Sequence, residues 1–210
     1  MKAKNLVLAF SPLIVFTLSG RLLGAPMIGW AALVSAGLAL VILVAGLRDG
    51  IKLVTAVSMI VFGALAALAL LGGSGGAGIV AQFGSGICAL LLGLAMLVST
   101  VTVPFTVSYA RASVPREHWE SPTFKAVNAR LSLVWAGVVI GIGLSRLAYG
   151  GLIVATGEQA GPVLRLGLGW GVPIALVLVG LRSTKRLTGD GRSDAQDRRP
   201  PVGTLPLDPS

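Results

Sequence analysis

The sequence predicts an all-α fold, a polytopic bundle of six transmembrane helices with both ends of the chain in the cytoplasm. The first observation is the composition: 54% of the 210 residues are hydrophobic and only 12% are charged, whereas roughly 25% are charged in soluble domains. The second is a series of apolar blocks about 20 residues long, the length that crosses the hydrocarbon core of a bilayer. The third is the uneven distribution of Lys and Arg between the connecting segments.

The first predicted span covers residues 5–24 and follows the basic residues Lys2 and Lys4. Pro12 lies inside it and removes one backbone hydrogen bond, so we expect this helix to bend, tilt or form a re-entrant turn. A basic start followed by an apolar run is also typical of a signal peptide. Because the stretch lacks a convincing small-x-small cleavage site before a soluble domain, we expect it to be retained as a helix.

Three further spans are predicted before the central polar segment, at residues 27–47, 51–71 and 87–110. The glycine-rich stretch at 72–76 predicts a flexible connector after the third span. Residues 79–83 are expected to form an interfacial turn, and a break at 84–86 separates this turn from the fourth span. Pro104 predicts a kink near the cytoplasmic end of that span.

Two spans complete the predicted bundle, at residues 126–149 and 163–181. They close a single membrane domain that covers residues 1–182. Residues 183–210 are rich in Pro, Gly, Asp and Arg and poor in large apolar side chains, so they cannot bury a core. We expect this segment to be a disordered cytoplasmic tail.

The cations determine the predicted orientation. With six spans and a cytoplasmic N-terminus, 14 of the 17 Lys and Arg residues lie inside and only Arg21, Arg146 and Arg165 lie outside, in agreement with the positive-inside rule. The net charge of +9 is explained by this orientation, and we expect anionic lipid headgroups rather than nucleic acid as its counterpart. Arg146 and Arg165 are expected to reach water along the outer ends of their helices.

The predicted spans contain few groups that carry chemistry. No acidic residue lies near the middle of any span, which argues against ion-coupled transport because a proton or cation would need an ionisable site within the hydrocarbon. The hydroxyl residues of segment 99–106 could line a path for a solute, although such hydroxyls more often bond to helix backbone. Cys88 is the single cysteine, so it can form no intrachain disulfide.

The central loop, residues 104–135, is the longest polar interruption in the first 180 residues. It contains Glu117, His118 and Glu120. Adjacent positions do not converge on one helical face, and the sequence has no second histidine to complete a usual zinc site. We therefore predict no enzyme activity, no metal and no cofactor, and treat a membrane enzyme that uses this loop as a rival hypothesis.

The same loop is the candidate contact surface. Trp119 and Phe124 are typical of aromatic anchors at headgroup level, with nearby arginines facing phosphates. The residues predicted to contact lipid or a partner are Arg111, Arg116, Trp119, Phe124, Asn128, Arg130 and Trp135. The predicted partners are the bilayer with its anionic headgroups and other membrane proteins. Two G-x-x-x-G pairs, at 137–141 and 167–171, favour close helix packing and leave a homodimer open.

Several short motifs follow one another along residues 5–180. Segment 12–16 reads Pro-Leu-Ile-Val-Phe and segment 61–65 reads Val-Phe-Gly-Ala-Leu; further on, Pro115 and Trp119 precede Asn128 and Trp135. This order resembles the bacterial intracellular septation protein A family of inner-membrane proteins, which has Pro-Leu-Val-Val-Phe, Val-Phe-Gly-Gly-Leu, Pro-x-x-Trp, Asn-Leu and Ala-Trp in similar places. The chain departs from the pattern at 103–106, in the longer interval at 120–127 and in its basic tail.

The resemblance implies a distant member with a role in envelope maintenance or septation, exercised by binding other membrane proteins, and it transfers no catalytic residue. The sequence therefore predicts a non-enzymatic, multi-pass protein of the bacterial inner membrane that acts as an interaction component. The alternative is a small transporter or channel for a neutral or lipidic solute.

Overall fold

The computed structural model describes residues 3–47, 52–111, 114–157 and 161–197, which are mostly helical and contain no β-strand. Five helical segments are long and apolar enough to cross a membrane: Ala25–Ala45, Leu53–Leu71, Gly73–Ser99, Pro122–Thr156 and Gly167–Leu187. The described residues thus confirm an all-α protein with several membrane-length helices. The apolar stretch of the first helix, Phe10–Gly20, is only about 16 Å long, so the crossing of the first predicted span, the total of six and the orientation stay predictions.

The first three helices form antiparallel neighbours. Helix α1, Ala3–Leu23, continues through Pro12 without a break, and a short 3₁₀ turn, Ala25–Met27, leads into α2, Ile28–Ala45. Gly24 makes this turn with a φ of 73°, a backbone conformation that favours glycine. Helix α3, Leu53–Leu71, then packs against α2.

Helix α4, Gly73–Ser99, corrects the prediction for residues 72–86. Residues 73–86 of the expected connector, turn and break are part of one continuous helix, and only Gly72 stays outside it as a bend after α3. The reason is packing: a Cβ atom on Gly86 would lie 2.9 Å from the Leu147 side chain, and one on Gly93 would lie 2.8 Å from the backbone nitrogen of Ile140. These glycines let α4 approach the later helix closely, as small residues do in membrane bundles.

The predicted fourth span ends early. Helix α4 stops at Ser99, and residues 105–110 form a separate short helix, α5, Phe105–Ala110. Pro104 precedes it in an extended conformation, with φ −51° and ψ 126°, because proline lacks the amide hydrogen needed to continue a helix. Phe105 and Tyr109 of α5 are buried and stack edge to face, with ring centroids 6.2 Å apart.

The last part of the chain is a long helical hairpin. After a 3₁₀ turn, Arg116–His118, helix α6 covers Pro122–Thr156; its 35 residues extend over about 52 Å, well beyond the predicted span at 126–149. The chain returns through α7, Pro162–Leu166, and a π-helical turn, Gly167–Gly171, into α8, Val172–Asp197.

Helix α8 corrects the expectation of a disordered segment from residue 183. The chain is helical to Asp197, and only residues 198–210 of the predicted tail lie outside the described residues. Beyond residue 182 the helix still packs against α6, since Trp135 Nε1 of α6 donates a hydrogen bond to Thr184 Oγ1 of α8 at 3.1 Å.

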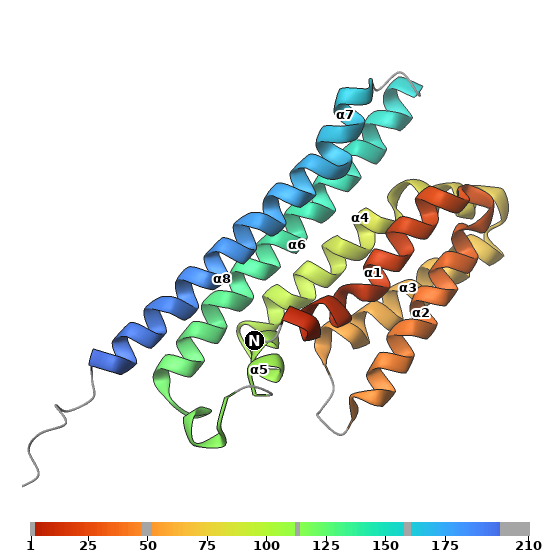
Figure 1. Cartoon of the computed structure of the whole chain (residues 1–210). Helices are drawn as coiled ribbons and strands as arrows, with labels where there is room; N and C mark the ends of the chain where they lie inside the picture. The colour runs from red at the N-terminus through yellow and green to blue at the C-terminus, as the bar shows by residue number, and fades with distance from the viewer. Residues whose placement is uncertain (1–2, 48–51, 112–113, 158–160, 198–210) are drawn as a thin grey trace, which may run out of the picture.

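The helices form two groups that meet along α4 and α6 (Figure 1). Helices α1 to α4 pack around one core cluster, in which Phe16 and Phe62 lie with ring centroids 5.1 Å apart. A second cluster joins α4, α5 and α6 and contains Leu92, Met96 and Trp135. The α6–α8 hairpin leans away from α1, so a space opens between them that side chains from both groups border.

Candidate functional site

The predicted contact loop is held in place by buried hydrogen bonds between α5 and α6. Thr106 Oγ1 donates to the carbonyl of Asn128 at 2.8 Å and lies 2.9 Å from Ser132 Oγ, while Asn128 Nδ2 donates to the carbonyl of Phe124 at 2.8 Å. Thr106, Asn128 and Ser132 are all buried. A satisfied polar cluster of this kind fixes one relative position of the two helices, since any shift would leave polar atoms unpaired.

Three hydroxyl side chains of segment 99–106, the predicted solute path, donate hydrogen bonds to nearby backbone carbonyls. Ser99 donates to the carbonyl of Met96 at 2.6 Å, and Thr100 donates to that of Leu97 at 2.6 Å. Thr102 donates to the carbonyl of Ser99 at 3.4 Å. None of these hydroxyls is among the residues lining the two pockets described below, which favours a packing role for the segment.

Two arginines gather on one aromatic ring at the loop. The guanidinium carbon of Arg111 lies 4.8 Å from the centroid of the Trp119 ring, and that of Arg116 lies 5.7 Å from it. Trp119 is fixed in turn by its indole N–H, which donates to the carbonyl of Val114 at 2.9 Å. Arginine over tryptophan is a favourable cation–π arrangement, and both arginines remain exposed. We call Arg111, Arg116 and Trp119 the arginine–tryptophan cluster.

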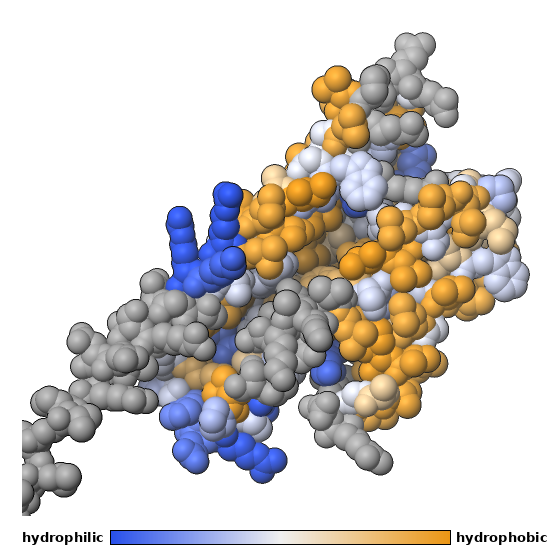
Figure 2. All heavy atoms as spheres, viewed as in Figure 1, coloured by the Kyte–Doolittle hydropathy of each residue, from blue (hydrophilic) through white to orange (hydrophobic). Residues whose placement is uncertain are grey.

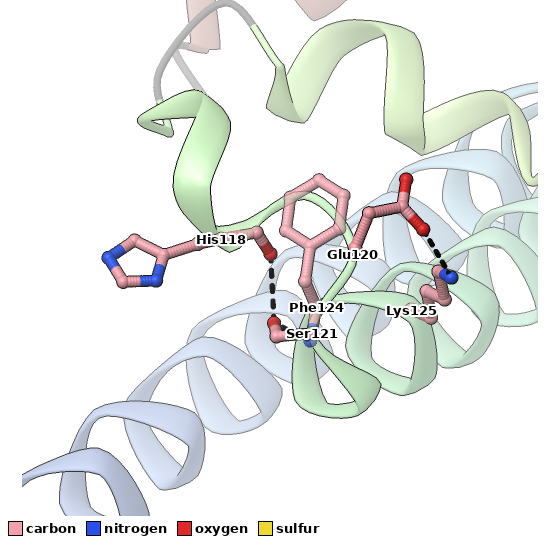
Figure 3. A network of polar contacts seen from close by, with 5 residues as sticks. All are labelled: His118, Glu120, Ser121, Phe124 and Lys125. Atoms are coloured by element: carbon pink, nitrogen blue, oxygen red, sulfur yellow. Dashed lines mark hydrogen bonds and ion pairs between the residues drawn. The ribbon is translucent and has the colours of Figure 1, made fainter.

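The start of α6 is capped beside this cluster (Figure 3). Ser121 Oγ accepts a hydrogen bond from the Phe124 amide at 3.2 Å and donates to the His118 carbonyl at 2.8 Å. Lys125 Nζ donates to Glu120 at 2.6 Å; this hydrogen bond and the Lys125 charge lower the pKa of the Glu120 carboxyl. Both side chains are exposed, so the ion pair contributes little to stability.

The loop residues considered for catalysis do not converge. The His118 imidazole is exposed and points away from Glu120 in Figure 3. Among the described residues, no group of three His, Cys, Asp or Glu side chains could hold a metal ion. The buried Cys88 lies in α4, remote in sequence from this loop and packed in the first core cluster.

The structure divides the predicted contact residues into two sets. Arg111, Arg116 and Arg130 are exposed, and Trp119 and Phe124 are half-buried. These five residues lie around the loop and on the adjoining surface of α6. Asn128 and Trp135 are instead 3% and 5% exposed. The side-chain amide of Asn128 donates to the Phe124 carbonyl within α6, and the indole N–H of Trp135 donates to Thr184 of α8. Because both side chains are buried, neither forms part of the exposed surface of the loop.

A second candidate site lies in the groove between α1 and the α6–α8 hairpin. It consists of two adjoining pockets with volumes of about 380 and 450 Å³, and the two share Thr17, Ser85 and Arg146. Both volumes fall in the range of small-molecule sites. Figure 2 shows hydrophobic surface on both sides of the hollow between α8 and α1.

The two pockets differ in polarity. The apolar pocket is lined mainly by hydrophobic side chains, among them Phe10, Ile14, Ala89, Trp135, Ile142 and Val177. The polar pocket contains Gln82, Arg146 and Tyr149 and the glycines Gly20, Gly150 and Gly169. Gln82 Nε2 donates to the carbonyl of Gly150 at 2.9 Å, which ties α4 to α6 at this level. The groove is therefore amphipathic, with Arg146 where its two parts meet.

The sequence predicted Arg146 only as a residue near the outer end of a helix. It did not predict the groove that Arg146 lines. The available signal was a lone arginine in the apolar run of α6 with no acidic residue in that helix. An ionisable side chain at such a position is a functional candidate in its own right.

Comparison of the chain with models of protein families, with curated proteins and with solved structures finds no match.

Proposed function

We propose that the chain is a non-enzymatic, six-span protein of the bacterial inner membrane that binds another membrane protein at its cytoplasmic edge. This role fits a distant member of the septation protein A family, and it concerns envelope organisation or septation. The contact surface is the arginine–tryptophan cluster of Arg111, Arg116 and Trp119, with Phe124 and Arg130 beside it.

The observation that carries the proposal is the set of hydrogen bonds that positions the elements on either side of this cluster. Thr106 joins α5 to α6 through its contacts with Asn128 and Ser132, and the Ser121 cap fixes the start of α6. Tryptophan and arginine are enriched among the interface residues that contribute most to binding energy.

Two further features support the proposed orientation. The start of α1, helix α5 and the C-terminal part of α8 lie at the same end of the molecule in Figure 1. This is the arrangement expected when six crossings return the chain to the side where it began. The cluster carries its positive charges at that end, in agreement with the positive-inside rule.

The proposal is tested by complementation combined with site-specific crosslinking. A strain that lacks the gene is expected to show an envelope or septation defect, which the wild-type chain corrects. The double variant Arg111→Gln and Arg116→Gln should reach normal abundance yet fail to correct it, and a photocrosslinker at His118 should lose its membrane-protein adduct in that variant. Arg182→Gln with Arg186→Gln, two exposed cations of α8, is the matched control.

The proposed contact surface would be contradicted if the double variant of Arg111 and Arg116 corrected the envelope or septation defect and kept the crosslinked adduct at His118. A crosslinker at Ile60, which is 65% exposed on α3, reports random lipid-side encounters. An equal adduct at Ile60 and at His118 would also count against a specific partner.

The amphipathic groove favours a second candidate function, the binding or movement of a lipidic solute. A solute with an apolar body fits the apolar pocket, and the adjoining polar pocket provides groups for a head. The hydrophilic path through segment 99–106 receives no such support, because its hydroxyls bond to the backbone. Transfer of a fluorescent lipid between the leaflets of vesicles that contain the protein is the test of this function.

A further inference from the structure

The groove between α1 and the α6–α8 hairpin matches a single lipid in length. Its apolar pocket is lined along α6 from Trp135 to Arg146, and along the π-helical turn and α8 from Trp170 to Leu181. Each of these stretches covers about 16 Å of helix. Half of a hydrocarbon core of roughly 30 Å is about 15 Å, so the pocket is as long as one leaflet.

The positive charge in the groove favours a lipid with an anionic headgroup. Arg146 is the cation shared by both pockets, and none of the described residues that line them is acidic. Helices α2, α3, α4 and α6 carry no Asp or Glu at all. The planar guanidinium of Arg146 carries the positive charge of the groove, and its fork of N–H donors matches the oxygens of a phosphate.

The segment that precedes α8 is an irregular helical turn, and two of its residues line the pockets that contain Arg146. Residues Gly167–Gly171 form a π-helical turn, a feature found frequently at functional sites. It brings Gly169 to the polar pocket and Trp170 to the apolar pocket. Ser145, the neighbour of Arg146, donates to the carbonyl of Leu168 at 2.8 Å and holds the turn against α6.

The polar pocket lies at the end of the bundle opposite the arginine–tryptophan cluster. Gly20 near the end of α1 and Ile28 at the start of α2 both line it. With the proposed orientation, this end faces the outer leaflet, and the apolar pocket runs from there toward the middle of the membrane.

We propose that the groove binds one anionic phospholipid of the outer leaflet, with its phosphate at Arg146 and one acyl chain in the apolar pocket. The inference names the ligand class of the lipidic-solute function and rests on that function for its biological role. Gln82 and Tyr149 border the head, and Ile14 and Trp135 border the chain.

Native mass spectrometry of the purified full-length protein measures this binding. The probes are phosphatidylglycerol and phosphatidylcholine with identical acyl chains, added to delipidated protein in detergent. The wild type should prefer phosphatidylglycerol, and Arg146→Gln should weaken its binding about tenfold, the effect of losing a charged hydrogen bond. Arg186→Gln on exposed α8 surface should change nothing. An excess of inorganic phosphate should not displace the lipid, because phosphate lacks the chain.

A second pair of variants tests the chain pocket without touching the charge. Ile14 is 45% exposed and lines the apolar pocket, so Ile14→Trp should fill the groove and reduce binding of both lipids several-fold. Ile60→Trp places the same side chain on an exposed face of α3, away from both pockets, and should leave binding unchanged. This pair decides the matter if Arg146→Gln fails to fold.

Three results would overturn the inference. The first is an equal preference for phosphatidylglycerol in the wild type and in Arg146→Gln. The second is equal lipid binding by Ile14→Trp and Ile60→Trp. The third is a lipid-free dimer that Ile14→Trp converts to monomers, which would assign the groove to a second copy of the chain. A protein that binds phosphatidylglycerol here but does not move it between leaflets would lose the proposed transport function and keep the lipid site.

Discussion

At the scale of single residues, Thr106 is the centre of the buried hydrogen bonds that join α5 to α6. Replacing it with valine keeps the shape of the side chain and removes the hydroxyl that lies between Asn128 and Ser132. We expect Thr106→Val to lower the free energy of unfolding by about 1–3 kcal/mol, because buried polar atoms lose a partner. Thermal unfolding of the purified protein in detergent measures the change.

Thr100→Val is the matched control, since its hydroxyl bonds only to the carbonyl of Leu97 three residues earlier in the same helix. Its effect should stay within about 0.5 kcal/mol, as is usual for sites away from a buried network. Equal losses in the two variants would mean that the bonds between α5 and α6 contribute nothing special.

The same residue scale shows what a sequence can and cannot disclose about a site. Trp119 and its neighbouring arginines were identifiable because aromatic and basic residues together are typical of a membrane interface. Asn128 and Trp135 were predicted on the same ground of polar and aromatic character near the loop, yet the fold buries them. Arg146 was undervalued for the opposite reason: its importance arises from α1, α4 and α8 residues that only the tertiary structure brings beside it.

At the scale of elements, α4 is the helix that glycine content alone predicted wrongly. Local rules treat clustered glycines as breakers, but in a bundle they allow close contact between backbones. The G-x-x-x-G pair at 137–141 identified this use in part: Gly137 faces open space, whereas a Cβ on Gly141 would lie 2.9 Å from the Leu176 side chain of α8. The pattern missed Gly143, where a Cβ would lie 2.6 Å from the Leu90 nitrogen of α4. The spans of α2 and α3 were predicted well because uninterrupted apolar length determines them.

Two glycine substitutions on α4 separate these effects. Gly93→Ala should destabilise the protein by about 1–3 kcal/mol, because the new Cβ would overlap the backbone of Ile140 on α6. Gly78→Ala meets nothing within 4 Å and should stabilise α4 by up to about 1 kcal/mol through its greater helix propensity. The comparison uses unfolding temperatures in one detergent. A loss at Gly78 as large as that at Gly93 would show that glycine is needed for flexibility rather than for close packing.

At the scale of the whole molecule, the two candidate sites occupy opposite ends, and their assignment to the two sides of the membrane depends on orientation. Ser74 lies exposed at the start of α4, and His118 lies exposed in the loop before α6. In a Cys88→Ala background, we expect a membrane-impermeant maleimide added outside spheroplasts to label Ser74→Cys and to leave His118→Cys unlabelled. Permeabilised cells should label both, which controls for reactivity.

The reverse pattern would place the arginine–tryptophan cluster outside and the Arg146 pocket toward the inner leaflet. The lipid inference would then keep its chemistry and change its leaflet, whereas a cytoplasmic partner would lose its docking surface. Labelling of both positions from outside would mean that α4 does not cross the membrane, which would contradict the multi-span architecture on which both sites depend. Orientation is therefore the one global property that separates a docking protein with an outer-leaflet lipid from any other arrangement of the same helices.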